Sequence, residues 1–197
     1  MCARRARTSQ HVAVIPHITF TELEPVADVE PLVRFLATHD FPFHRRRRVT
    51  TEQARETVLG GRFWSDDCVS FWVVADDSRI GIAVIDDLTD VASGGSPTFD
   101  LRFAEADRGR GLGVPVLRGL TEMVFVRWPD IARFEGHTRE DNVAMRATFR
   151  SAGWVKEAFH RDAWPLDGAP PLASVAYSVL RRDWESGTMT PVTWDDL

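Results

Sequence analysis

The sequence predicts a mixed α+β fold in which a mostly antiparallel central sheet is flanked by helices. Two apolar segments, 69–75 and 79–86, are joined by the turn residues Asp76-Asp77-Ser78, and this pattern indicates an antiparallel hairpin. Further along, a strand, a glycine-rich turn, an amphipathic helix and a second strand follow one another, which requires strands that are locally parallel. The complete predicted order is β-α-α-β-β-β-α-β-α-β-β.

The first elements follow from periodicity and capping. Apolar and polar residues alternate over 18–23, which predicts a strand, and apolar residues recur at helical spacing over 27–38. The segment Phe41-Pro42-Phe43-His44 ends this helix, and its aromatic residues fit a pocket wall or lid as well as a core. The pair Thr50-Thr51 offers a cap for a second helix, which ends at Gly60-Gly61.

The second half of the chain is interpreted in the same way. Apolar periodicity predicts each strand and helix, and glycine or proline marks most of their ends. The predicted elements are a strand at 98–105, a helix over 114–128, a strand at 131–138, a helix over 140–152 closed by Gly153, a strand at 154–163, a turn at Pro165–Pro171 and a final strand at 174–182.

Length and composition indicate one globular domain. The 197 residues suffice for a full core, and 44% hydrophobic and 27% charged residues are ordinary values for a soluble protein. We expect a flexible N-terminal arm at 1–15, a single domain at 16–186 and a C-terminal tail at 187–197. Of the two cysteines, Cys2 lies in the arm, so a structural disulfide is not expected, and neither cysteine has metal-ligand spacing around it.

Charge and hydropathy bear on the partners. The formal net charge of −5 argues against a nucleic-acid partner, and no apolar run reaches the length of a membrane span. We therefore expect a cytoplasmic protein. The one strongly basic run, Arg45–Arg48, is interpreted first as a solvated loop, with an acidic partner or cofactor phosphates as the alternatives.

The stretch Arg108–Gly113, which reads RGRGLG, carries the strongest chemical signal. An apolar strand precedes it and an amphipathic helix follows it. Glycines allow a close backbone approach, and the first N–H groups of a helix have no partner within the helix, so this arrangement is typical of an anion site.

Three classes of ligand use such a turn. A P-loop needs Lys and then Ser or Thr at the helix start, but Val114 and Pro115 follow Gly113. A dinucleotide fold needs G-x-G-x-x-G/A in its first β-α unit, whereas the third glycine here comes one place early and the turn lies mid-chain. The third pattern, Arg/Gln-x-x-Gly-x-Gly/Ala, is that of an acyl-coenzyme A turn, and RGRGLG matches it at every position.

With this turn the chain resembles the GNAT superfamily of acyl-CoA N-acyltransferases. A second block strengthens the resemblance, because Asn142–Met145, Phe149 and Gly153-Trp154 are similar to that family's Asn-x-x-Ala/Ser … Gly-Phe helix and strand. The ending 177–184 is similar to the last strand of the ribosomal-protein N-terminal acetyltransferase branch. Close packing of helix on strand is the alternative reason for the glycines of the turn.

The resemblance implies a GNAT-type fold, with a seven-stranded sheet splayed in its middle, and acetyl-CoA as the cofactor. Free backbone groups of the strand before the turn would pair with the pantetheine arm, and one N–H there would polarise the thioester carbonyl. The turn amides would hold the pyrophosphate. The residues implied in cofactor binding are Leu101, Phe103, Arg108, Gly109, Arg110, Gly111, Leu112, Gly113 and Asn142.

His137 is the first candidate for the general base. Histidine suits proton transfer near neutral pH, and His137 lies five residues before Asn142, where some members of the resembled family carry a catalytic carboxylate. Glu135 shares its strand face, and Asp100 on the preceding strand is a further candidate. A packing role for His137 is the alternative.

The general acid is left open by two departures from the family pattern. Phe149 stands where a tyrosine often protonates the thiolate, and Met145 stands where much of the ribosomal branch has a serine. Tyr177, the only tyrosine, would supply the acid or line the cleft, or it is an anchored core residue.

The leading functional hypothesis is an N-acetyltransferase that moves an acetyl group from acetyl-CoA to a primary amine, on a peptide or a small molecule, by direct attack. Phe41, Phe43 and His44 would wall the acceptor site. An acidic chain would suit a cationic acceptor, although charge alone does not rank acceptors. The alternative is a non-catalytic module that binds or senses acyl-CoA. A homodimer is compatible with the sequence, which does not determine the oligomeric state.

Overall fold

The structure is a computed structural model that describes residues 16–91 and 93–193. The predicted arm at 1–15 lies outside the described residues, as do 92 and 194–197. The strands are β1 (Ile18–Glu22), β2 (Val69–Ala75), β3 (Ser78–Asp86), β4 (Thr98–Phe103), β5 (Arg133–Arg139), β6 (Val155–Leu166) and β7 (Ala169–Leu180). The helices are α1 (Val29–Thr38), α2 (Thr51–Leu59), α3 (Leu88–Val91), the 3₁₀ turn η1 (Glu105–Asp107), α4 (Gly113–Arg127), α5 (Val143–Ser151) and α6 (Arg181–Ser186).

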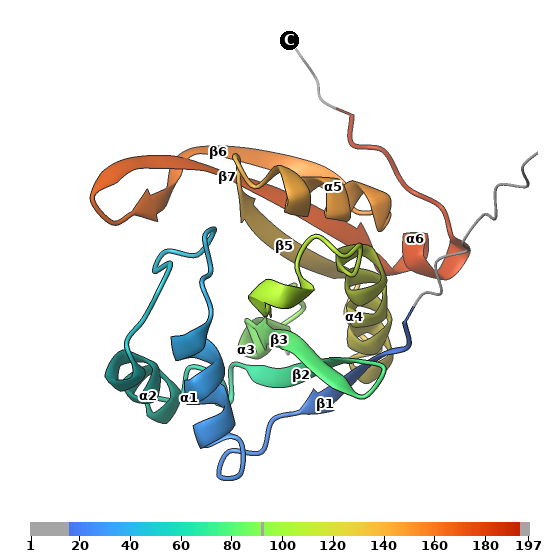
Figure 1. Cartoon of the computed structure of the whole chain (residues 1–197). Helices are drawn as coiled ribbons and strands as arrows, with labels where there is room; N and C mark the ends of the chain where they lie inside the picture. Colours follow the sequence, from blue (N-terminus) through green and yellow to red (C-terminus); the bar gives the residue numbers. More distant parts are fainter. Residues whose placement is uncertain (1–15, 92, 194–197) are drawn as a thin grey trace, which may run out of the picture.

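The strands form two sheets that meet at β4 and β5 (Figure 1). One sheet has the order β1-β2-β3-β4 and the other β5-β7-β6, and every pairing within them is antiparallel. The crossover through α4 brings β4 and β5 side by side, as predicted, but no ladder joins them among the described residues. The predicted mixed α+β fold class is confirmed, with its sheet divided at this point.

Local sequence explains the well-predicted elements. Thr50 caps α2 by accepting a hydrogen bond from the amide of Gln53, whose side chain accepts from the Thr50 amide, so the pair forms a capping box. Asp76 and Asp77 both have positive φ, which is the geometry of a two-residue hairpin turn whose twist matches the flanking strands.

The end of the chain was predicted wrongly in two places. The predicted turn at 165–171 is strand instead, since β6 extends to Leu166 and β7 starts at Ala169, joined by Asp167-Gly168. Asp-Gly is a strong signal for a two-residue hairpin, and Gly168 has the positive φ that it needs. The predicted final strand stops at Leu180, and 181–186 is the short helix α6.

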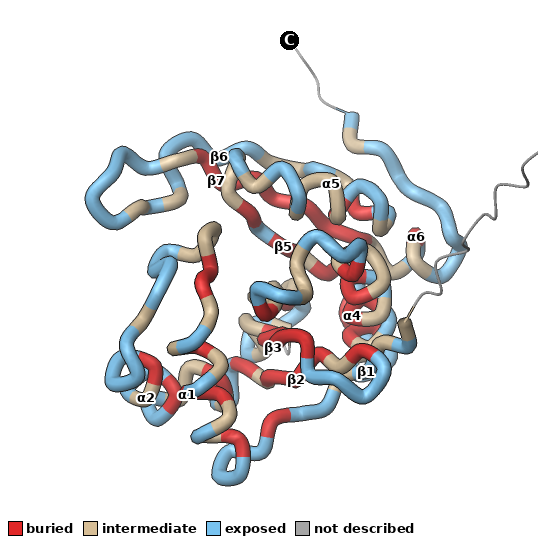
Figure 2. Tube along the Cα trace, in the orientation of Figure 1, coloured by how far each residue is buried: buried red, intermediate tan, exposed pale blue. Residues whose placement is uncertain are grey.

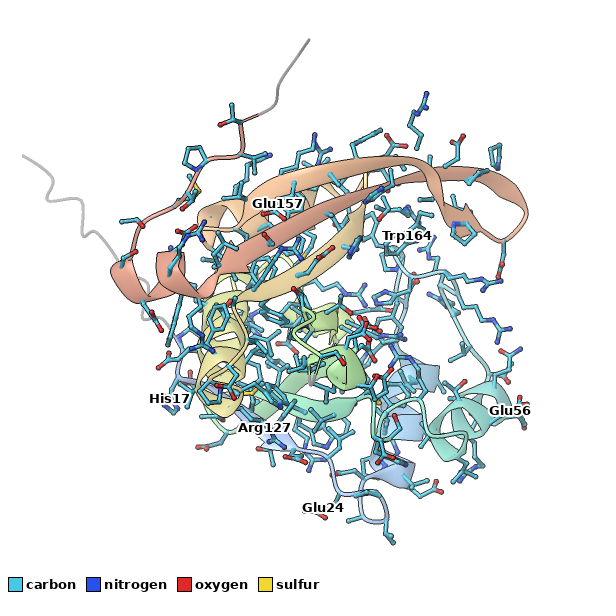
Figure 3. All side chains as sticks on the ribbon, turned by 180° about the vertical axis from the view of Figure 1, so that it is seen from behind. His17, Glu24, Glu56, Arg127, Glu157 and Trp164 are labelled. Carbon is cyan, nitrogen blue, oxygen red and sulfur yellow. The ribbon has the colours of Figure 1, made fainter. Side chains whose placement is uncertain are left out.

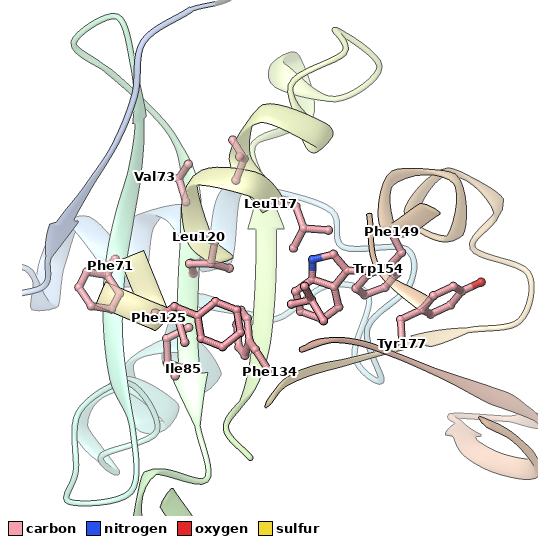
Figure 4. Close-up of a cluster of buried hydrophobic side chains, with 14 of the residues drawn as sticks. Phe71, Val73, Ile85, Leu117, Leu120, Phe125, Phe134, Phe149, Trp154 and Tyr177 are labelled. Carbon is pink, nitrogen blue, oxygen red and sulfur yellow. The ribbon is translucent and has the colours of Figure 1, made fainter. Parts of the chain in front are cut away.

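Both faces of the four-stranded sheet are buried. On β2, Phe71 packs into a core between this sheet, α4 and the other sheet, whereas Trp72 points to the opposite face and packs beneath α1 and α2. Trp154 lies in the first core, drawn in Figure 4, and its indole N–H donates to Thr121 at 3.3 Å. Figure 2 shows this buried interior and, at the edge of the fold, the exposed tip of the β6–β7 hairpin.

The β6–β7 hairpin extends beyond the end of β5. The pairing of β5 with β7 ends at Arg139 and Ser174, while β6 and β7 stay paired out to Leu166 and Ala169. This extension reaches the side of the molecule where the α1–α2 loop lies (Figure 1). Among the described residues, no helix combines the length and apolar character that crossing a membrane demands.

Candidate active site

The division between β4 and β5 leaves backbone groups of β4 without strand partners. The amide of Ala104 donates to the carbonyl of Ile80 at 2.9 Å, so by antiparallel alternation Arg102 and Asp100 exchange the next bonds with β3. The peptide groups of Leu101 and Phe103 therefore point away from β3, toward β5. These are the two residues at which the resemblance implied open backbone groups.

The glycine turn presents a set of unpaired amides at the start of α4. Among the described residues, no protein acceptor receives a hydrogen bond from any amide of Gly109–Gly113. Gly109 and Gly111 have φ values of +70° and +78°, so a side chain at either would strain the backbone. The third glycine, Gly113, serves packing instead, because a Cβ there would lie 2.9 Å from Thr148 Oγ1 on α5.

Arg108 is engaged within the protein rather than at the turn. Its amide donates to Glu105 at 3.4 Å, and its guanidinium donates to the carbonyl of Phe103 at 3.0 and 3.1 Å and to that of Asp40. The free amides of the turn therefore begin at Gly109. Arg108 instead fixes the end of β4 to the start of the α1–α2 loop.

Two cavities lie along the open edge. The smaller cavity, of about 290 Å³, is lined by the glycine turn and by Ala144 and Thr148 of α5. The larger cavity, of about 700 Å³, is lined by residues of the α1–α2 loop, β4 and β5, and by Trp164 of the β6–β7 hairpin, which is labelled in Figure 3. Six residues line both cavities and form the shared wall: Phe43, His44, Leu101, Arg102, Asn142 and Met145.

His137 lines the larger cavity and is oriented by Glu135. Its Nε2 lies 2.6 Å from Glu135 Oε1, and its Nδ1 lies 3.5 Å from Ser174 Oγ. Arg133 binds the same carboxylate. Burial opposes the charge of Glu135, but the hydrogen bonds and charges of Arg133 and His137 outweigh it, so the pKa of Glu135 lies below its usual value. A carboxylate can only accept, so Nε2 carries the proton and the lone pair is on Nδ1.

A second histidine–carboxylate pair, from the α1–α2 loop and β4, also lines the larger cavity. His44 Nε2 is 2.8 Å from Asp100 Oδ1, and Arg102 binds the other carboxylate oxygen of Asp100 at 2.6 and 3.0 Å. Burial raises the pKa of Asp100, but the Arg102 guanidinium and the hydrogen bonds from Arg102 and His44 outweigh it, so the pKa lies well below its usual value. Asp100 therefore stays ionised and paired. The other ring nitrogen of His44 is buried without a partner among the described residues.

The remaining predicted residues divide between the cleft and the core. Phe43 and Asn142 lie on the shared wall, while Phe41 lines the smaller cavity from a buried position beside Arg102 and Arg108. Asn142 also caps α5, accepting from the amide of Met145 at 3.2 Å.

Tyr177 is not brought to the cleft. It is 1% exposed and its ring stacks on Phe149 with centroids 4.5 Å apart, within the core drawn in Figure 4. It lines neither cavity. The structure thus places Tyr177 where the anchored-core interpretation expected it.

Sequence reasoning did not single out several lining residues. Arg45 and Arg46 line the larger cavity, although the run to which they belong was interpreted first as solvated surface. Arg62, Arg102 and Trp164 also line it. These residues are not part of the recognised motifs, so the sequence did not indicate that they line the cavity. The one available signal was that the arginine run directly follows His44, a predicted site residue.

Comparison with known proteins agrees with this geometry. Residues 17–155 match the family described as "Acetyltransferase (GNAT) domain". Among solved structures, a probable acetyltransferase is 23% identical, with a TM-score of 0.67 over 85% of this chain and 95% of that chain. The spermidine N-acetyltransferase from Vibrio cholerae, in complex with CoA and spermine, is 12% identical, with a TM-score of 0.68 over 85% and 98%. The ribosomal L7/L12 alpha-N-protein acetyltransferase, in complex with coenzyme A, is 17% identical, with a TM-score of 0.65 over 83% and 93%.

Proposed function

The chain belongs to the GNAT acetyltransferase family and is an acetyl-CoA-dependent N-acetyltransferase, and from this premise we propose that it acetylates a primary amine held in the larger cavity. The amine would attack the thioester directly, with no acetyl group on the enzyme. The observation that carries the proposal is the shared wall, because it lets a donor in the smaller cavity meet an acceptor in the larger one.

The residues of the smaller cavity fit acetyl-CoA. Unpaired amides at Gly109–Gly113 are donors for the pyrophosphate, where the start of α4 also favours negative charge. The peptide group of Leu101 and the amide of Phe103 would pair with the pantetheine arm, since the Phe103 carbonyl is already bound by Arg108, and Asn142 would face the arm from the shared wall. When bound, the cofactor supplies an activated acetyl thioester.

We assign the general base to His137. Glu135 fixes its tautomer and leaves the Nδ1 lone pair as acceptor, so a proton from the attacking amine can pass to Nδ1. Asp100 is less suited to this role because Arg102 and His44 hold it ionised at low proton affinity. Its role in the proposal is to hold His44, and with it the α1–α2 loop, against β4.

The leaving thiolate has no hydroxyl donor on the shared wall. Phe149 and Tyr177 are packed in the core, and none of the six shared-wall residues carries a hydroxyl. The wall does carry the Arg102 guanidinium, whose Nε and Nη2 bind Asp100 and whose Nη1 makes no hydrogen bond among the described residues, so that Nη1 would donate to a negative sulfur. We therefore propose electrostatic stabilisation by Arg102 in place of protonation by a tyrosine.

The test follows thiol release while the protein is incubated with acetyl-CoA and a broad panel of amines. The proposal expects free thiol and acetylated amine in equal amounts for at least one acceptor, and no acetyl-enzyme on mass spectrometry. Tight binding of coenzyme A without thiol release on any amine would instead support the non-catalytic acyl-CoA-binding module.

A further inference from the structure

Two arginines of the larger cavity have no side-chain partner among the described residues. Arg45 and Arg46 are exposed residues of the α1–α2 loop, and among the described residues neither forms a salt bridge or a side-chain hydrogen bond. Their neighbours in the run are different, since Arg47 and Arg48 both pair with Asp40, at 2.6 and 3.6 Å. The run thus separates into one half that anchors the loop and one half that faces the larger cavity.

The loop holds these two charges in place from both sides. Before them in the chain, His44 is bonded to Asp100 on β4. After them, Arg47 makes a two-pronged contact with Asp40, and the amide of Phe41 donates to the Arg47 carbonyl at 2.8 Å, which closes the loop on itself. A charge on an anchored loop costs less conformational entropy to use than one on a free segment.

The lining of the larger cavity is basic overall. It contains four arginines and a single carboxylate, Asp100, which Arg102 and His44 already occupy. Arg62 is bound by Asp86, with contacts of 2.8 and 3.0 Å. The charge left over is therefore positive, and Arg45 and Arg46 supply it.

The same two arginines do not serve the glycine turn. Neither lines the smaller cavity, which holds the unpaired amides for the cofactor pyrophosphate. They line the larger cavity alone, as do the aromatic side chains of Phe63 and Trp164. A ligand that uses them must occupy the larger cavity.

We propose that the acceptor of this enzyme is an amine that also carries a carboxylate, and that Arg45 and Arg46 bind this carboxylate. The inference rests on the proposed function and specifies its acceptor. Guanidinium groups bind carboxylates through paired hydrogen bonds, and they repel a polycation such as a polyamine. The net charge of −5 for the whole chain pointed toward a cationic acceptor, but the charge that meets the acceptor is that of the cavity lining.

The test compares two amidated peptides that differ only at their second residue, Asp against Asn, together with L-phenylalanine against L-phenylalaninamide and with spermidine. The first pair supplies a side-chain carboxylate and the second an α-carboxylate, so the two arms distinguish the sources of the acid. For each pair, the measurement is the ratio of kcat/KM for the acidic member to that for its neutral partner.

The decisive variant is the double change Arg45→Gln and Arg46→Gln. We expect it to lower the ratio in at least one pair about tenfold, a factor that corresponds to about 1.4 kcal/mol of binding. The KM for acetyl-CoA should not change. The ratio within a pair depends on the acidity of each amine, but comparing variant with wild type cancels that contribution. Arg34→Gln is the matched control, since Arg34 is an exposed arginine of α1 that lines neither cavity.

Two results would overturn the inference while leaving the proposed function intact. One is a ratio in both pairs that the double variant does not change, and the other is a raised KM for acetyl-CoA, which would assign these arginines to the cofactor. Preferred acetylation of spermidine by the wild type would also contradict it. Failure of the proposed function has a different signature, namely coenzyme A binding with no acetylation of any amine.

Discussion

The amide of Glu135 donates a hydrogen bond to the carbonyl of Pro97 at 3.1 Å, and this bond joins β5 to the start of β4. At the neighbouring residue, Gly136, a Cβ atom would lie 2.5 Å from Phe99 Cε1 and 2.8 Å from Phe149 Cζ. At this end the two sheets are thus held together by aromatic rings that pack directly against the backbone of a glycine. Beyond it they separate, and the open edge of β4 begins.

The first prediction concerns this closed end. We expect Gly136→Ala to lower the free energy of unfolding by about 1–3 kcal/mol, because both rings would have to move from a tightly packed core. Urea unfolding measures the change. Gly119→Ala is the comparison, since its Cβ would lie 3.2 Å from a ring edge of Phe20 and alanine favours the helix there. Equal stability of the Gly136 variant and wild type would show that this packing does not hold the sheets together.

The second prediction concerns the glycine turn. Gly111→Asp should weaken coenzyme A binding by at least about tenfold, since it adds a negative charge and strains a positive φ beside the proposed pyrophosphate site. Isothermal titration calorimetry measures the affinity. Gly168→Asp imposes the same strain at the tip of the β6–β7 hairpin, where φ is +75°, and should bind coenzyme A like wild type. Unchanged affinity in Gly111→Asp would remove the turn from the binding site.

The glycine turn and the positions of most helices and strands could be predicted from local sequence, because helices, hairpins and caps depend on residues that are near one another in the chain. The Asp167-Gly168 pair is a local signal for a two-residue hairpin turn, but the prolines on either side of it led to the prediction of a longer turn. Other features depend on contacts across the fold and could not be predicted. Arg108 turns inward because the carbonyls of Asp40 and Phe103 lie within its reach.

The third prediction concerns Asn142, which has both a capping and a cleft position. Asn142→Ala should lower stability by about 1 kcal/mol, since the amide of Met145 loses its acceptor. Asn142→Asp keeps a capping oxygen but loses the amide that donates to Thr138 Oγ1 at 3.0 Å. If Asn142 also serves the cofactor, the aspartate variant will be stable yet have a raised KM for acetyl-CoA. A normal KM in a stable aspartate variant would restrict Asn142 to capping.

The fourth prediction follows from the lowered pKa of Asp100. In the unfolded chain this carboxyl takes up a proton near pH 3.9, whereas in the folded protein Arg102 and His44 keep it ionised to lower pH. Its contribution to stability is therefore complete above the unfolded pKa and is lost as pH falls through the folded one. Asp100→Asn should cost on the order of 2 kcal/mol at neutral pH and should flatten the loss of stability below about pH 4.

Chemical unfolding at a series of pH values tests this prediction. Asp130→Asn is the control, since Asp130 is exposed and has no ion pair among the described residues. If Asp100→Asn and Asp130→Asn give the same dependence of stability on pH, the contacts of Asp100 with Arg102 and His44 do not contribute the predicted stability.

The last prediction concerns His137 as the general base. His137→Ala should lower kcat by about 10²–10⁴-fold with little change in the KM for acetyl-CoA, since proton transfer, not cofactor binding, is removed. The dependence of kcat/KM on pH should change as well, because the variant lacks the group that accepts the proton. Glu135→Gln should have a smaller effect on kcat, because Nε2 keeps a partner but loses the carboxylate that selects its tautomer.

His160→Ala is the matched control, since His160 stacks on His137 with ring centroids 6.3 Å apart but lines neither cavity. Equal rates for His137→Ala and His160→Ala across the pH range would leave His137 a packing residue, and His44 would then be the histidine to test.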